Sequence, residues 1–232
     1  MTGVELDYLF LDASHVKMRE GSRAEPILAA WGITTAGKPV FVGLAAVGSE
    51  STGAWHDFLT DLTARGLRPP LLIVSDAALV LIGAVEQVLS RSLRQRCLAQ
   101  RARNVLAKVS AGDQAEVKAA YWQNVDLTEL GENVTPDQQL VDWVQRRIDA
   151  FAETWAGRCP AAVKCLLSDR QSLTTYLCFP IEHHKRVRHS NSARPAAAPR
   201  SSATSPARPA AFPWSGRCLI APPAAGAAKS RN

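Results

Sequence analysis

The sequence lacks any apolar run close to the roughly 20 residues that a membrane-spanning helix needs. Its first residues also lack the basic start and apolar stretch of a signal peptide. Its cysteines are odd in number and do not show the paired short spacing of a zinc site. They are Cys97, Cys159, Cys165, Cys178 and Cys218. We therefore expect a cytoplasmic protein without a membrane span, in which all five cysteines are free thiols.

Acidic residues are absent from the C-terminal part of the chain, where no Asp or Glu follows Glu182. Residues 192–232 hold six Lys or Arg, which accounts for the whole net charge of +6, so the first 191 residues are electrically balanced. A basic composition of this kind is no evidence for DNA binding by the body of the protein. The same segment contains seven Pro and thirteen Ala without a helical or strand period, which predicts a disordered tail.

Short apolar runs near the N-terminus predict strands over residues 8–11, 26–34 and 39–47. A helix should follow from the capping residue Ser51 to Gly66, and a buried strand over residues 71–74 comes next. Three strands, a helix and a further strand are the opening order of the ribonuclease-H-like fold. In that fold the first and fourth strands are neighbours, so we expect an α/β protein with a mixed sheet.

The rest of the chain is predicted to be mostly helical. Residues 78–89 should form a helix, residues 94–98 a short fifth strand, and a helix should begin at Arg101. One stripe of apolar residues at helical spacing should belong to the core: Leu140, Val144, Ile148, Phe151 and Trp155. We therefore divide the chain into a catalytic core over 1–110, a helical insertion over 111–191 and the tail over 192–232.

Two carboxylates stand at the ends of predicted strands. Asp12 follows the first strand and Asp76 follows the fourth. If these strands are neighbours, both side chains lie at one edge of the sheet, where they could hold Mg²⁺ or Mn²⁺ for an in-line phosphoryl transfer. The alternative is that both are ordinary turn residues, since Asp is common at strand ends.

Several stretches carry a resemblance to one family. Residues 8–17, 55–66, 72–76 and above all 95–106 (QRCLAQRARNVL) resemble the catalytic core of mutator-type transposases of bacterial insertion sequences. The resemblance implies an Mg²⁺-dependent enzyme that cleaves DNA at the element's ends and transfers the strands to a target. It also implies that Asp12 and Asp76 are catalytic metal ligands. The expected partners are DNA at the element ends and target, with a further copy of the chain or an intact transposase as possible protein partners, while the resemblance does not fix the oligomeric state.

The sequence departs from the family pattern at three places. The family has a His three residues after the cysteine of the 95–106 stretch, and Gln100 stands there. It favours glycines after the second Asp, where Ala77 follows Asp76, which reduces backbone freedom beside the site. It places its third carboxylate three residues after a stretch like residues 182–191, and Arg194 occupies that position.

These departures point to an inactive remnant. Because the resemblance ends where the Ala, Pro and Arg-rich tail begins, we interpret residues 192–232 as the translation of a shifted reading frame. Two other interpretations stay open. The chain could be a catalytically dead fragment that binds DNA or an intact transposase and so acts as an inhibitor, or it could be an unselected open reading frame that folds poorly.

Four further residues are candidate ligands or nucleophiles. His183, His184 and His189 lie among basic residues, which favours a solvated or DNA-facing segment over a metal site. Cys97 is expected to be a buried, unreactive thiol.

Overall fold

The computed structural model describes residues 5–17, 24–131 and 134–190, so the predicted disorder of residues 192–232 concerns a segment outside the described residues. The strands are β1 (Leu6–Val16), β2 (Glu25–Thr34), β3 (Pro39–Ala46), β4 (Leu72–Ser75) and β5 (Leu93–Arg96). The α-helices are α1 (Thr52–Ala64), α2 (Leu79–Val88), α3 (Leu98–Leu106), α4 (Gln114–Gln123), α5 (Gln138–Trp155), α6 (Pro160–Leu167) and α7 (His184–Val187). Short 3-10 helices are η1 (Thr128–Leu130), η2 (Gln171–Leu173), η3 (Thr175–Cys178) and η4 (Ile181–His183).

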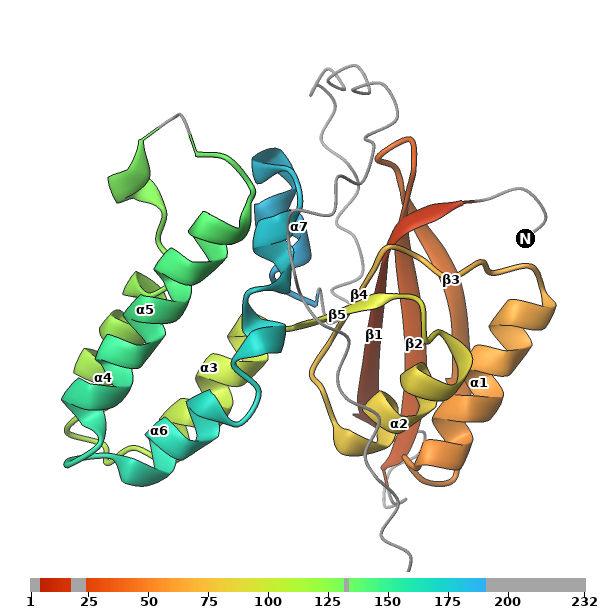
Figure 1. Ribbon diagram of the computed structural model, residues 1–232. Coiled ribbons are helices and arrows are strands. Elements are labelled where there is room, and N and C mark those ends of the chain that lie inside the picture. Colours follow the sequence, from red (N-terminus) through yellow and green to blue (C-terminus); the bar gives the residue numbers. More distant parts are fainter. Residues whose placement is uncertain (1–4, 18–23, 132–133, 191–232) are drawn as a thin grey trace, which may run out of the picture.

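The five strands form one mixed sheet in the order β3-β2-β1-β4-β5 (Figure 1). The first three strands are antiparallel, while β4 runs parallel to both β1 and β5. The prediction that the first and fourth strands are neighbours is therefore confirmed. This adjacency brings two segments about 60 residues apart in the sequence to the same part of the sheet.

The strand β1 is longer than the sequence analysis predicted. It continues through Asp12 to Val16, because it pairs with the antiparallel β2 as far as Val16 and Glu25. Its parallel pairing with β4 is shorter and extends only to Phe10 and Val74. Asp12 thus lies within a strand, just beyond the region where β1 has a neighbour on each side, and not at the strand end.

The turn between β2 and β3 forms where it was predicted. Gly37 has a φ of 72°, which only glycine adopts without steric cost. Its backbone N–H donates to Thr34 O at 2.8 Å, and the N–H of Thr34 donates to Lys38 O at 2.9 Å. The tight connection sets the register of the antiparallel pair.

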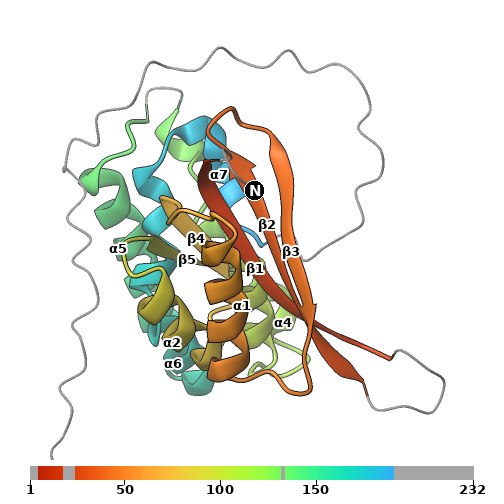
Figure 2. The same cartoon turned by 90° about the vertical axis from the view of Figure 1, so that its right-hand side faces the viewer.

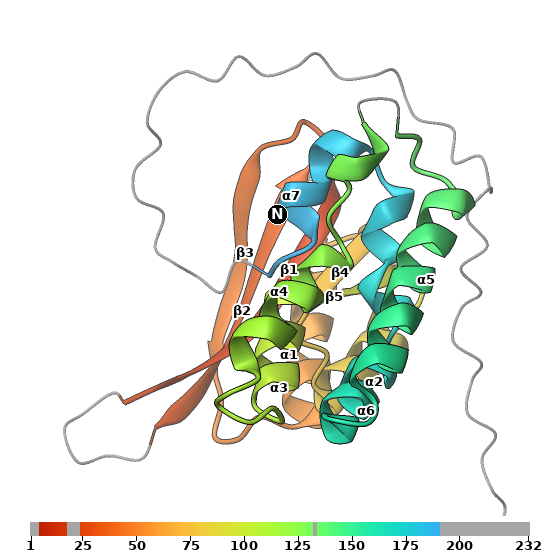
Figure 3. The same ribbon diagram turned by 90° about the vertical axis from the view of Figure 1, so that its left-hand side faces the viewer.

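Helices cover both faces of the sheet. Because side chains alternate along a strand, Leu9 and Ile73 face α1 and α2, whereas Phe10 and Val74 face the helical half of the molecule. Figure 2 views the sheet from the side of α1, and Figure 3 views it from the side of α3 to α6. The sheet is therefore the middle of three layers.

The helix α1 confirms its predicted start and end. The Ser51 hydroxyl accepts a hydrogen bond from the Ala54 N–H at 3.1 Å, which caps the first turn. The chain leaves the helix at Gly66, whose φ is 99°. The buried side chains are Trp55, Phe58, Leu59 and Leu62.

The long helix α5 buries the whole predicted apolar stripe. The helix α3, in contrast, begins at Leu98 and not at Arg101 as predicted. Its first backbone N–H donates to Arg188 O at 2.9 Å, and the Tyr121 hydroxyl donates to Leu98 O at 2.8 Å. These two contacts from distant segments fix the start of α3, and local sequence could not reveal them.

The cysteines agree only in part with the prediction of five free thiols. Cys97, Cys159 and Cys165 are free. Cys178 is disulfide-bonded, which corrects the prediction for this residue. Pairing of this kind depends on distance in space and not on spacing along the chain. Within the described ranges, no helix is both long enough and apolar enough to cross a membrane.

Candidate functional site

The two predicted ligands lie at matching positions, Asp12 on β1 and Asp76 directly after the neighbouring β4. Asp12 and Asp76 each come two residues after the paired residues Phe10 and Val74 on β1 and β4. The alternation along β1 directs Asp12, like Phe10, to the face that α3 to α7 cover. Both carboxylates are half-buried. The sheet thus brings together the two side chains that the sequence analysis singled out.

The electrostatic environment of Asp12 disfavours its charged form. Burial and, second to it, the neighbouring negative charge of Asp76 raise the pKa of Asp12 to about 6. A hydrogen bond from the backbone of Ala13 and the positive charge of Arg103 act in the opposite direction, while Glu50 adds a small repulsion. Two carboxylates that repel one another in a half-buried place are a suitable environment for a divalent cation.

The carboxylate pair offers two ligands and not three. No group of three His, Cys, Asp or Glu side chains suited to a metal ion occurs in the described part of the chain. Glu182, the last acid in the sequence, is exposed on η4 and does not complete such a group. Arg194, at the position where the family has its third carboxylate, lies outside the described residues. Carboxylate oxygens fit Mg²⁺, which takes one or two of them and fills its other positions with water and phosphate.

A tight turn links Asp76 to α2. The Asp76 carboxylate accepts a hydrogen bond from the Ala78 N–H at 3.0 Å, and the Ser75 hydroxyl accepts one from the Ala77 N–H at 3.2 Å. Ala77 has a φ of 54°, and among the described residues it is the one non-glycine residue with a positive φ. This is the position where the family favours glycine and the chain has alanine. The structure shows that the backbone keeps a conformation that favours glycine.

The most specific stretch of the sequence, residues 95–106, joins the sheet to the helical half. The buried Gln95 side chain donates to Arg96 O at 2.6 Å and to Leu173 O at 3.2 Å, and it accepts from the Tyr176 N–H at 2.8 Å. Cys97 is buried and free, as expected of an unreactive thiol. The stretch therefore organises contacts between segments that are far apart in the sequence.

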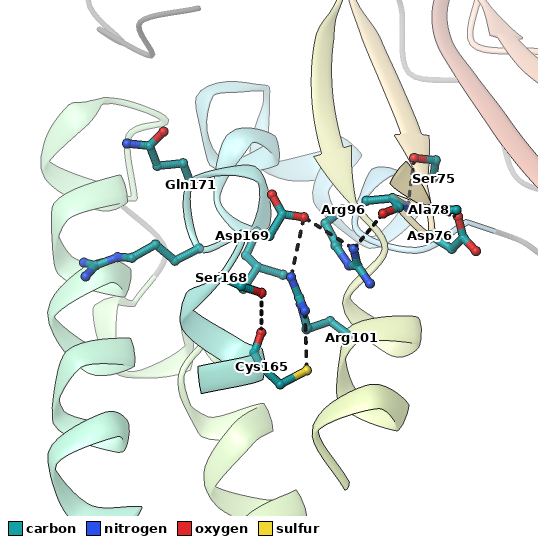
Figure 4. A network of polar contacts seen from close by, with 12 residues as sticks. Ser75, Asp76, Ala78, Arg96, Arg101, Cys165, Ser168, Asp169 and Gln171 are labelled. Atoms are coloured by element: carbon teal, nitrogen blue, oxygen red, sulfur yellow. Dashed lines mark hydrogen bonds and ion pairs between the residues drawn. The ribbon is translucent and has the colours of Figure 1, made fainter. Parts of the chain in front are cut away.

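Two arginines of this stretch converge on one carboxylate beside the site. Arg96 and Arg101 are both buried, at 8% and 4% exposure, and lie 3.4 and 3.5 Å from Asp169 Oδ2. Figure 4 shows Arg96 between Asp169 and the turn that carries Asp76. Burial and the neighbouring Arg101 lower the pKa of Arg96, while Asp169 and Asp76 oppose this change.

Two of the three candidate histidines prove to be structural. His184 is 5% exposed, and its Nε2 lies 2.8 Å from Phe179 O. The ring of His189 packs against Trp122, with ring centroids 5.8 Å apart. Desolvation lowers the pKa of both histidines. The expectation of a solvated or DNA-facing segment is therefore wrong for His184, because the short helix α7 turns it into the core.

The third histidine, His183, is partly buried. Its Nδ1 forms a hydrogen bond of 2.6 Å with the Tyr8 hydroxyl on β1. The neighbouring Lys185 and Arg186 are exposed, so the basic side chains of the segment are the part that faces solvent.

Sequence reasoning missed the residues that hold the site in place. Arg96 and Arg101 lie in the stretch that carries the family resemblance, so their position was a signal, although a buried role for two cations was not inferred. Asp169 gave no signal, because it is 73 residues from Arg96 in the sequence. Glu50, which acts on Asp12 from a distance, was also not identified.

Comparison with known proteins gives one consistent family. The profile described as "Transposase, Mutator family" matches residues 3–194. The chain is 30% identical over 162 residues to the transposase for insertion sequence element IST2 of Acidithiobacillus ferrooxidans, covering 69% of this chain and 51% of that protein. It is 28% identical over 190 residues to the transposase for ISRM5 of Rhizobium meliloti, covering 79% and 44%.

A third relative is the transposase for IS6120 of Mycolicibacterium smegmatis, which is 26% identical over 191 residues, covering 82% of this chain and 56% of the relative. The chain thus spans about half the length of the relatives it matches.

Proposed function

The chain belongs to the Mutator family of transposases, and from this premise we propose that its function is Mg²⁺-dependent cleavage and transfer of DNA strands at the ends of an insertion element. Its partners would be the element ends, a target DNA and further copies of a transposase, in the bacterial cytoplasm and on the nucleoid. The observation that carries the proposal is the placement of Asp12 on β1 and of Asp76 directly after the neighbouring parallel strand β4.

We assign the sheet and its helices to the ribonuclease-H-like fold. The support is the order β3-β2-β1-β4-β5, in which three antiparallel strands precede a parallel fourth strand beside the first. Within this fold we keep residues 1–110 as the catalytic core and residues 111–191 as a helical insertion. The insertion would position the catalytic edge, since its helices pack on the sheet face that carries Phe10 and Val74.

Asp12 and Asp76 would hold Mg²⁺, or Mn²⁺ in its place, through their carboxylate oxygens. The bound ions supply activation of the attacking oxygen and stabilisation of the leaving oxygen. The protein's own contribution is to fix the two carboxylates on rigid strands and to keep them partly shielded from water, which strengthens their attraction for a cation. Arg103, whose charge acts on Asp12, is exposed and available to a DNA phosphate.

We further propose that this chain has lost the activity. A site with two carboxylates retains part of its affinity for one metal ion, but a second ion loses a principal ligand when the third carboxylate is replaced by Arg194. A guanidinium is always protonated and would repel the ions that the carboxylates attract.

A second candidate function is that of an inhibitor that binds DNA or an intact transposase without catalysing transfer. The observation that favours it is the absence of a third suitable ligand among residues 5–17, 24–131 and 134–190, together with an otherwise well-packed core. The two functions can be distinguished by adding the chain to an active related transposase on an element end that both bind. The measured quantity is strand transfer by that transposase. Inhibition that persists after Asp12→Asn would favour the second function.

The metal site can be tested by titrating the chain with Mn²⁺ and following the free-ion signal by electron paramagnetic resonance. We expect weak binding that Asp12→Asn and Asp76→Asn each abolish. Asp57→Asn is the matched control, because Asp57 is an exposed carboxylate on α1 with a side-chain exposure of 88%. Binding that is indifferent to Asp12 and Asp76, or equally sensitive to Asp57, would refute the assignment.

A further inference from the structure

The turn after Asp76 is held in an unfavourable backbone conformation. Ala77 occupies the left-handed region with a φ of 54°. For a residue with a Cβ this conformation persists only where surrounding contacts determine it. Two of these contacts come from within the turn, namely the hydrogen bonds that the Ser75 hydroxyl and the Asp76 carboxylate accept from Ala77 N and Ala78 N.

A third contact on the turn comes from β5. The terminal nitrogen Nη1 of Arg96 donates to Ala77 O at 3.2 Å, and the same nitrogen lies 3.4 Å from Asp169 Oδ2 (Figure 4). Through this one nitrogen, Arg96 therefore links the turn to the segment after α6. Because it is 8% exposed, it has little freedom to leave this geometry.

Arg101 provides an internal comparison. It is also buried, and its Nη2 lies 3.5 Å from the same Asp169 oxygen, but its other polar contact is Cys165 Sγ at 3.5 Å, away from the turn. The two arginines thus share burial, charge and an acidic partner. They differ in that Arg96 bonds to the turn that carries Asp76.

We propose that Arg96, anchored by Asp169, is a positioning residue that fixes the turn of residues 75–78 and thereby the orientation of the Asp76 carboxylate. The helical half of the molecule would in this way set the geometry of the metal-binding edge. The orientation of Asp76 has a consequence for metal binding only under the proposed function, whereas the fixing of the turn does not depend on it.

The test compares Arg96→Met with Arg101→Met in the full chain. Each substitution removes one buried positive charge and leaves Asp169 paired with the other arginine. The loss of a cation near Asp76 would by itself strengthen Mn²⁺ binding, so weaker binding in Arg96→Met cannot be an effect of charge. Arg96→Lys restores a donor and should recover part of any effect.

The first readout needs no metal. Hydrogen exchange of the Ala78 N–H, which donates to Asp76, should become about tenfold faster in Arg96→Met, as expected when a hydrogen bond from a charged group is lost. The second readout is the Mn²⁺ dissociation constant, which should rise about tenfold, in the range seen when an outer partner of a metal ligand is removed. Arg101→Met should change neither.

Each outcome has a definite meaning. Unchanged exchange at Ala78 in Arg96→Met, or an equal change in Arg101→Met, would overturn the proposal. Faster exchange with unchanged Mn²⁺ affinity would also overturn it, because the turn would then not govern Asp76. If Asp76→Asn leaves Mn²⁺ binding by the unmodified protein unaltered, the proposed metal site fails, and the exchange readout still decides whether Arg96 fixes the turn.

Discussion

The Asp12 carboxyl shows how a single buried acid links stability to pH. Its pKa is raised to about 6, first by burial and second by Asp76. The folded state therefore binds the proton more tightly than the unfolded chain, whose Asp pKa is about 3.8. Below the Asp12 pKa of the unfolded chain, the carboxyl is protonated in both states, and ionisation costs no stability. Above the Asp12 pKa of the folded protein, the cost of ionising the carboxyl is fully present, so the free energy of unfolding falls as the pH rises between the two values.

We predict that Asp12→Asn removes this cost. The variant should gain stability relative to the unmodified protein on going from pH 4 to pH 8, by about 1–2 kcal/mol, since one pKa unit corresponds to about 1.4 kcal/mol and partial exposure reduces the effect. Urea unfolding at the two pH values measures it, with Asp57→Asn as the exposed control. A gain that is independent of pH would contradict the assigned shift.

Ala77 offers a second prediction at this scale. Ala77→Gly should stabilise the protein by about 0.5–1 kcal/mol, because the relief of a left-handed alanine, about 1–2 kcal/mol, exceeds the entropy that glycine adds to the unfolded chain. The control is Ala78→Gly, since Ala78 has a φ of −57° and gains nothing from glycine. It should lose about 0.5–1 kcal/mol. The midpoints of urea unfolding decide, and a loss of stability in Ala77→Gly would be the contrary result.

From the sequence, only those site residues could be predicted that belong to a recognisable sequence pattern. Asp12 and Asp76 could be predicted because each follows an apolar run, and the order of elements made their strands neighbours. The bridge from Asp169 through Arg96 could not, because a side-chain contact across 73 residues leaves no periodic signal.

Among the secondary-structure elements, prediction succeeded where local chemistry decides the structure. The cap at Ser51 and the stripe of α5 were both predicted from spacing alone. Prediction failed where contacts with a distant segment determine the bounds of an element. The start of α3 depends on a hydrogen bond to the backbone of Arg188, and the end of β1 depends on its pairing with β2. The short helix α7 belongs to the second group, since tertiary packing buries His184 despite its basic neighbours.

The junction between β5 and the helical half should depend on one polar side chain. Gln95 is 1% exposed and satisfies three backbone groups, so Gln95→Leu should cost about 3 kcal/mol by leaving buried amide and carbonyl groups without partners. Gln100→Leu is the matched control, because Gln100 lies in the same stretch and is only partly buried. Its effect should stay within about 0.5 kcal/mol. Equal costs in thermal or urea unfolding would show that Gln95 has no special role.

For the whole molecule, the arrangement of layers places the two carboxylates at a sheet that the helical half covers on one face. The sheet positions Asp12 and Asp76, while β5, α3 and the segment after α6 fix the turn beside them. Such a constellation acts as a unit, and removal of one member tends to cost nearly as much as removal of all. Under the proposed function, activity should therefore depend on a third carboxylate at the position of Arg194.

We predict that the 232-residue chain does not transfer DNA strands. Phosphoryl transfer accumulates negative charge around the metal ions, and without a third carboxylate the second ion loses a principal ligand, so activity should remain at background. The comparison is a chain with the reading frame restored after Asn191, an acidic residue at position 194 and a family-like N-terminal region, assayed on a cognate element end with Mg²⁺ or Mn²⁺. That chain should transfer strands, Asp12→Ala should abolish the reaction, and Asp57→Ala should not. Strand transfer by the unmodified chain that disappears with Asp12→Ala would contradict the prediction and would direct the search for a third ligand to Glu182.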